Sequence, residues 1–420
     1  MVVGIYNLIN SMLEKIEIFL YLIIFLFVNV GINIGEIFIS FSEIGVGLIL
    51  LITIIKNKKF SKTNSTFLFL VFVLYAGALS CIFSIFGLIN TIEFIKSFIR
   101  ILGILAVILF FPTTFLYNHN KKLIGKIILC TIFINLLISL LQYYQIIQLK
   151  EAYGLIRFWG GTDFNLRANS LYLEPSWNSI INVLLFSLYI FIFQKYFTKS
   201  KTILNVSTSL AVIMIILLSR SISGVILFIF VISIMILAYF IKFYRIVKSK
   251  QRILLKMDKI LIFLSIIFLV VALIFILPLK NSNFLKDISN NFLILEKRIY
   301  SNIYEDFDMS LENRLITDYK VVTDNILKGN ILGSGLGQAD LYIYKHINQV
   351  DSRFSAFIQY ACFETGFLGV ILIYLTFFCI PDMNKKYLAV FFLSTLMWGG
   401  LYLSFPWIFI LLGNEEFKKL

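Results

Sequence analysis

Residues 222–241 read ISGVILFIFVISIMILAYFI, and residues 242–259 continue as KFYRIVKSKQRILLKMDK. The first stretch has the length and apolar character of a helix that crosses a hydrocarbon core of roughly 30 Å. The second stretch carries the cluster of lysines and arginines that marks the cytoplasmic side of such a crossing. Together they predict a membrane-spanning helix followed by a cytoplasmic loop.

The same alternation continues along the whole chain. With 60% hydrophobic and 14% charged residues, the composition excludes a soluble or a disordered protein. We expect an all-α polytopic membrane protein that forms a single integral membrane domain over residues 1–420, with about 11–12 transmembrane helices. The expected spans lie near residues 16–34, 37–55, 66–88, 98–117, 123–147, 178–197, 202–218, 222–241, 260–278, 356–380 and 387–412.

Basic residues follow every even-numbered span, for example Lys56 to Lys62 after the second and Lys385 with Lys386 after the tenth. Positive charge in short loops sets the orientation of a membrane protein, so we expect a multi-pass protein of the cytoplasmic (inner) membrane with a cytoplasmic N-terminus. The net charge of +14 is then an orientation signal, and nucleic acid is not an expected partner. Gly399, Gly400 and Pro406 are able to break the last span into a re-entrant pair, which leaves the side of the C-terminus open.

One long polar segment, residues 280–355, separates the ninth and tenth spans on the predicted outer side. Ordered loops of such length commonly serve binding or chemistry. Apolar residues at helical spacing over Leu311–Leu327 predict a partly helical extracytoplasmic loop. The glycine-rich stretch that follows, KGNILGSGLGQ, is interpreted as a turn packed closely against neighbouring helices rather than as a phosphate-binding loop.

Arginines gather on the same predicted side of the membrane. An ionisable residue at membrane depth is costly and is therefore a functional hypothesis. Arg220, in a tight turn between two apolar helices, and Arg314, in the long segment, suit bidentate binding of phosphate or carboxylate. Other candidates are Arg100, one helical turn after Lys96, and Arg157 and Arg167 in the first large outer loop; interfacial anchoring is the alternative for these.

Three further side chains on the predicted outer side are candidates for acid–base or capping roles. His346 is the only histidine on the outer side and is a candidate general base, and Asp351 is a competing carboxylate base. Glu174 is placed to cap the start of the sixth span, where the helix dipole favours a carboxylate.

Four stretches resemble the O-antigen polymerase and O-antigen ligase superfamily (Wzy-type polysaccharide polymerases). They are SLYLEPSWNSI at 170–180, SRSISGVILF at 219–228, ENRLITDYKVVTDNILKGNILGSGLG at 312–337 and DSRFSAFIQYACFETGFLG at 351–369. The resemblance also rests on the multi-span architecture with one long outer loop, and it covers the C-terminal two-thirds of the chain. In the family pattern the catalytic histidine lies closer to the final motif than His346 does, and Asp351 occupies that register here.

The resemblance implies inverting glycosyl transfer at the outer membrane face. Undecaprenyl-pyrophosphate-linked oligosaccharides would be donor and acceptor, and the product would be O-antigen, capsular or similar polysaccharide. Arg220 and Arg314, assisted by Arg100 or Arg167, would stabilise the pyrophosphate leaving group, and His346 or Asp351 would be the base. Glu174 would orient sugar hydroxyls, with helix capping as the alternative, and aromatic residues of the outer segments, among them Tyr172 and Trp177, would be sugar-stacking platforms. The two histidines lie on opposite sides of the membrane and show no ligand spacing, so we expect a metal-independent enzyme without a cofactor. Chain-length regulator and flippase proteins are the partners that the resemblance implies.

Two alternatives stay open. The first is ligase-type transfer of finished polymer to another acceptor, which sequence separates poorly from polymerisation. The second, from a different class, is a transporter or flippase of lipid-linked sugars. Against a transporter, the sequence has no repeated halves and shows no paired broken helices.

Overall fold

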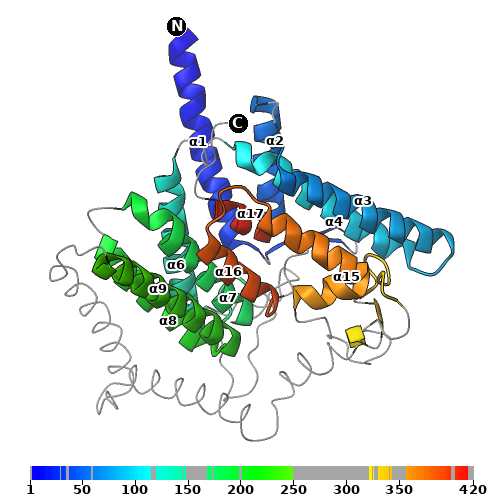
Figure 1. Ribbon diagram of the computed structural model, residues 1–420. Coiled ribbons are helices and arrows are strands. Elements are labelled where there is room, and N and C mark those ends of the chain that lie inside the picture. Colours follow the sequence, from blue (N-terminus) through cyan, green and yellow to red (C-terminus); the bar gives the residue numbers. More distant parts are fainter. Residues whose placement is uncertain are drawn as a thin grey trace, which may run out of the picture.

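The structure is a computed structural model, shown in Figure 1. It describes residues 2–28, 30–34, 37–57, 60–114, 120–144, 146–147, 168–172, 175–197, 201–248, 321–323, 325, 330–339, 341–342, 356–398 and 403–414. The elements are almost all helical. They are α1 (Val2–Leu26), β1 (Gly31–Ile34), β2 (Ile37–Ser40), α2 (Phe41–Asn57), α3 (Asn64–Ile85), α4 (Thr91–Phe110), the 3-10 turn η1 (Phe111–Thr113), α6 (Lys121–Tyr143), α7 (Pro175–Leu188), the π-helical turn η3 (Tyr189–Phe193), the 3-10 turn η4 (Gln194–Tyr196), α8 (Lys201–Ser219), α9 (Ile222–Lys248), α15 (Phe357–Phe378), α16 (Lys385–Thr395) and α17 (Phe405–Leu412).

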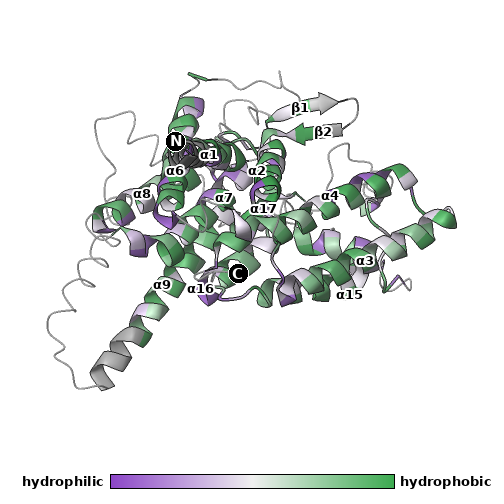
Figure 2. Cartoon of the chain, turned by 90° about the horizontal axis from the view of Figure 1, so that it is seen from above, coloured by the Kyte–Doolittle hydropathy of each residue, from purple (hydrophilic) through white to green (hydrophobic). Residues whose placement is uncertain are grey.

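The described residues contain 7 helices that are long and apolar enough to cross a membrane. They are α3, α4 with η1, α6, α7 with η3 and η4, α8, the first 20 residues of α9, and α15. Figure 2 shows apolar residues over most of these helices, as expected where lipid replaces water around a bundle. The predicted all-α polytopic membrane fold is therefore confirmed, and its expected span at 260–278 lies outside the described residues.

The first two expected spans differ from the observed elements. α1 begins earlier than expected and ends at Leu26, and β1 and β2 then form an antiparallel hairpin in which Gly31 pairs with Ser40. The hairpin occupies residues that hydropathy alone assigns to both spans. Isoleucines alternate with other residues along GINI and IFIS, and β-branched residues at a period of two favour strands over helices.

α7 occupies the centre of the bundle, because nearly all of its side chains are buried. It packs against α6, α8 and α9 and also touches α16 and α17. α17 completes this core: all eight of its residues, Phe405–Leu412, are buried. The indole of Trp407 lies 4.9 Å from the ring of Phe69 and 5.0 Å from that of Phe377, which joins α17 to α3 and α15.

The last expected span, 387–412, is a re-entrant pair of short helices. α16 ends at Thr395 and α17 begins at Phe405. After α17 the chain is back at the end of the bundle where α16 begins. There the N–H of Asn384 donates to the carbonyl of Gly413 at 3.0 Å, and Met383 forms a bridge with Asn414. The break expected from the glycines and Pro406 is thus present, and residue 414 lies at the same end of the bundle as residue 383.

The glycine-rich stretch after residue 329 is a turn packed against helices, as the sequence predicts. Gly333, Gly335 and Gly337 have φ values of 94°, 90° and 76°, which only glycine adopts easily. A Cβ on Gly333 would lie 2.5 Å from the carbonyl oxygen of Glu364, and one on Gly337 would lie 2.3 Å from that of Glu93. Residues 321–323 and 325, within the predicted Leu311–Leu327 helix, are helical.

Candidate functional site

Arg220 lies in the two-residue turn that joins α8 to α9. Its backbone is left-handed, with φ 48°, and its N–H donates to the carbonyl of Leu217 at 3.2 Å. Only 7% of the residue is exposed, although it carries a permanent charge. A left-handed conformation costs a residue with a side chain about 1–2 kcal/mol compared with glycine. The fold therefore holds an arginine in a strained and buried position, which is typical of functional sites.

Three neighbouring segments fix this turn. The N–H of Ala168 donates to the carbonyl of Leu218 at 3.0 Å, and the hydroxyls of Ser219 and Ser179 are hydrogen bonded to each other. Gly224 packs so closely on α7 that a Cβ there would lie 2.4 Å from the Cβ of Ser179. α7, α8, α9 and the segment 168–172 thus meet at Arg220.

A network of buried amides extends from this turn into the bundle. Asn135 of α6 donates to the phenolic oxygen of Tyr172 at 2.9 Å and to the side-chain oxygen of Asn182 at 3.1 Å. Asn178 donates to the hydroxyl of Ser139 at 3.0 Å, and Asn182 donates to the carbonyl of Asn178 at 2.7 Å. Inside an apolar bundle, a buried polar group without a hydrogen-bond partner is costly, so each of these groups needs such a partner. The network therefore fixes the positions of α6 and α7 relative to each other.

The segment 168–172 is held by the same network. Gln142 accepts from the N–H of Ser170 at 2.7 Å and donates to its carbonyl at 2.8 Å, while the Ser170 hydroxyl donates to Asn135 at 2.9 Å. Ser170 is left-handed, with φ 53°. Burial raises the pKa of Tyr172, so its hydroxyl stays protonated and donates to the carbonyl of Phe25 at 2.9 Å. Segment 168–172 is thus a rigid support for the Arg220 turn.

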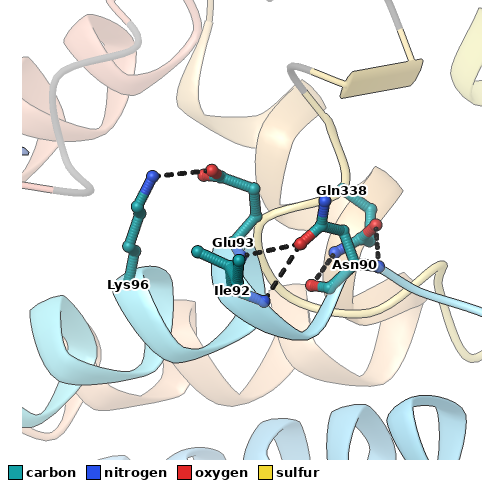
Figure 3. A network of polar contacts seen from close by, with 5 residues as sticks. All are labelled: Asn90, Ile92, Glu93, Lys96 and Gln338. Carbon is teal, nitrogen blue, oxygen red and sulfur yellow. Dashed lines mark hydrogen bonds and ion pairs between the residues drawn. The ribbon is translucent and has the colours of Figure 1, made fainter. Parts of the chain in front are cut away.

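Of the candidate charged and acid–base residues, the structure describes Arg220 and Arg100. Arg100 is exposed on α4, close enough to Glu43 of α2 for their charges to interact, and Lys96 forms an ion pair with Glu93 at 2.8 Å (Figure 3). α4 packs mainly against α2, α3 and α17, whereas α8 and α9 pack mainly against α6, α7 and α16. Figures 1 and 2 both show α4 well apart from α8 and α9, so the structure does not bring Arg100 to Arg220.

The remaining candidates lie outside the described residues. They are His346, Asp351, Arg314, Arg157, Arg167 and Glu174. Among the residues that the structure does describe, no three His, Cys, Asp or Glu side chains gather as a metal site would need.

The expectation that Tyr172 could stack on a sugar is wrong. Its side chain is fully buried, with the phenol at the centre of the amide network. Trp177 packs edge-on against Trp398 at 5.6 Å and is partly buried. Sequence reasoning instead missed the amides, although a signal existed: Asn135, Ser139 and Gln142 share one helical face in an otherwise apolar span.

Searches against models of known protein families and against curated proteins find no match to this chain. Its class is therefore defined by its own residues as a polytopic helical membrane protein. Its distinctive internal feature is the polar centre around Arg220, which joins two of the stretches on which the family resemblance rests, 170–180 and 219–228.

Proposed function

We propose that this protein polymerises undecaprenyl-pyrophosphate-linked oligosaccharide repeat units into a surface polysaccharide by glycosyl transfer at the outer face of the cytoplasmic membrane. The observation that carries the proposal is the buried, strained Arg220 beside a fixed polar network. A pyrophosphate leaving group departs with its own negative charge, so it requires a preorganised cation more than an acid. A guanidinium held in a low-dielectric site meets that requirement.

The arrangement of helix ends supports one polar working face. Contacts join the end of α6, segment 168–172 and the α8–α9 turn at one end of their helices. Contacts between Asn384 and both Gly413 and Phe191 join the opposite end of α7 to the α16–α17 pair. This second end of the bundle carries three lysines, Lys195, Lys385 and Lys386. Because positive charge marks the cytoplasmic side, the proposed orientation puts this end in the cytoplasm and Arg220 at the outer face.

In the proposed reaction, the acceptor hydroxyl attacks the anomeric carbon of the donor and the lipid pyrophosphate leaves from the opposite side. Arg220 stabilises the charge that develops on the leaving pyrophosphate. Arg314 would share that role, and His346 or Asp351 would take the acceptor proton, as the resemblance implies. Transfer of finished polymer to another acceptor would use the same chemistry and differs only in the acceptor.

A carrier of lipid-linked sugar is the second candidate, because the structure contains interrupted helices. α15 is non-helical at Gly366, and α16 and α17 form a re-entrant pair. Interrupted helices are frequent at the binding sites of transporters. These interrupted helices remove one of the two reasons for which a carrier was disfavoured from the sequence; the lack of repeated halves is the other.

One experiment separates these functions. Purified protein in liposomes is given a lipid-linked repeat unit that carries a fluorescent label, and the products are resolved by size. Products longer by whole repeats are expected for the polymerase. Unchanged substrate that redistributes between leaflets would identify a carrier instead, and transfer only to an added non-repeat acceptor would identify a ligase.

A further inference from the structure

The break in α15 is filled by another part of the chain. In a continuous helix the N–H of Phe367 would donate to the carbonyl of Phe363. Here the Phe367 N–H donates to the carbonyl of Ile331 at 3.3 Å, and the Phe363 carbonyl accepts from the N–H of Ser334 at 2.8 Å. Residues 331–334 are thus inserted into the hydrogen-bond ladder of α15 at the point where Gly366 has φ 64° and ψ −170°.

Residues 331–334 and the broken part of α15 pack in direct contact. A Cβ on Gly366 would lie 2.2 Å from the carbonyl oxygen of Ile331. The hydroxyl of Tyr75, from α3, lies 3.1 Å from the carbonyl oxygens of both Leu332 and Thr365, one on each side of the junction. We call the turn 331–339 together with the α15 break the interlock.

The carboxylate of Glu364 closes the interlock. Its Oε1 atom accepts from the N–H of Gly337 at 3.0 Å and from that of Ala339 at 3.3 Å, and the residue is only 4% exposed. A buried charge in a membrane-spanning helix is costly unless it is hydrogen bonded. Backbone N–H groups of the turn provide such bonds, and an ionised Glu364 would bind the turn more strongly than a neutral acceptor.

The other side of the turn is fixed to the α3–α4 hairpin. Gln338 donates to the carbonyl of Asn90 at 3.3 Å and accepts from its N–H at 3.1 Å (Figure 3). The N–H of Leu336 donates to the hydroxyl of Ser80 at 2.9 Å. The interlock therefore joins α3, α4 and α15.

We propose that Glu364 is a positioning residue, which fixes the glycine-rich turn 331–339 against the break in α15 through the backbone of Gly337 and Ala339. This inference rests on the proposed function, because the candidate bases His346 and Asp351 follow this turn in the sequence. Glu364 acts through the turn that it fixes and does not touch the substrate.

The test compares Glu364→Ala with Thr376→Val, a buried position in the same helix whose hydroxyl donates to the carbonyl of Leu372. Hydrogen–deuterium exchange is measured over residues 330–342 in nanodiscs, and polymerisation is measured per folded molecule. We expect exchange to accelerate and kcat to fall by about tenfold or more in Glu364→Ala, because hydrogen bonds to charged groups contribute most. KM for the lipid-linked unit should stay unchanged, and Thr376→Val should match the parent protein in exchange and in kcat.

Glu364→Gln covers the case in which Glu364→Ala does not fold. The amide retains an acceptor oxygen but loses the charge, so we expect a smaller acceleration of exchange and a smaller fall in kcat. Unchanged exchange and kcat in Glu364→Gln would overturn the role of the charge, and faster exchange at unchanged kcat would overturn the positioning role. A parent protein that does not elongate the lipid-linked unit would instead overturn the proposed function, and the catalytic role of Glu364 with it.

Discussion

Gln142 and Ser170 exchange two hydrogen bonds across the space between α6 and the segment before α7: the Ser170 N–H donates to the Gln142 Oε1 at 2.7 Å, and the Gln142 Nε2 donates to the Ser170 carbonyl at 2.8 Å. The Gln142 side chain thus provides the hydrogen bonds that a neighbouring strand or helix normally provides to a buried backbone N–H and carbonyl. Since Ala168 in the same segment bonds to Leu218, the pair also supports the turn that carries Arg220.

Replacing Gln142 should therefore destabilise the fold. Gln142→Leu leaves the N–H and the carbonyl of Ser170 without these partners, and each buried group left unsatisfied costs about 1–3 kcal/mol. Thermal unfolding in detergent should show a clear loss of stability. Thr131→Val, in the same helix, removes a hydroxyl that bonds to the carbonyl of its own helix at Ile127 and should cost much less. Equal losses in the two variants would contradict the supporting role of Gln142.

Arg220 can be tested with two variants that lose activity to the same extent but differ in stability. Arg220→Gly and Arg220→Ala both remove the guanidinium, and we expect each to lower the polymerisation rate by about 10²-fold or more. Glycine relieves the left-handed backbone strain whereas alanine retains it, so the glycine variant should be the more stable of the two by about 1 kcal/mol.

Unfolding and polymerisation are measured on the same preparations of these two variants. Lys201→Ala removes an exposed cation at the other end of α8 and should keep full activity. Full activity in both Arg220 variants would show that the arginine does not stabilise the leaving group.

The close contact between α9 and α7 gives a second stability prediction. Gly224→Ala would place a Cβ 2.4 Å from the Cβ of Ser179, so the helices must separate, at a cost of about 1–3 kcal/mol. Gly103→Ala is the matched control, because no atom lies within 4 Å of the new Cβ and alanine favours the helix. The midpoint of thermal unfolding should fall in Gly224→Ala and should stay the same or rise in Gly103→Ala.

The re-entrant pair predicts the positions of three residues relative to the membrane. Asn384 bonds to Gly413, so we expect a cysteine at Asp382 and one at Glu416, two residues after the last described residue Asn414, to be labelled by a membrane-impermeant thiol reagent from the same side. A cysteine at Leu88, in the α3–α4 turn, should be labelled from the opposite side. α3 and α15 run antiparallel, with Tyr75 beside Thr365 and Phe69 beside the same indole, Trp407, as Phe377. Labelling is done in spheroplasts and in inverted vesicles of a cysteine-free variant, and opposite sides for Asp382 and Glu416 would exclude a re-entrant pair.

Hydropathy predicted the helices that face lipid and was less informative about the interior. The expected span at 66–88 is observed as Asn64–Ile85, because a helix needs a fixed apolar length to cross the bilayer. Hydropathy also assigned residues 31–34 and 37–40 to the first two membrane spans, because isoleucine counts as apolar whether it lies in a strand or in a helix. Only their alternation distinguishes the two, and the hairpin follows that alternation.

The interior contacts depend on residues far apart in the sequence. The position of Gly366 marks a possible break, but the break forms because residues 331–334 replace its helical partners, and no local pattern predicts that pairing. The candidate site shows the same limit. Arg220 could be selected as a charge at membrane depth, whereas the link from Gln142 through Ser170 and Ala168 to its turn required the fold.

The position of α17 has a consequence for how the protein is made. Its rings lie among those of helices synthesised much earlier: Phe409 stacks on Phe25 at 5.4 Å, and Trp407 contacts Phe69. Early helices can enter the membrane one by one, yet they cannot complete their packing until residues 405–412 leave the ribosome. Until then the surfaces of these helices that α17 covers in the finished fold lack their final partner.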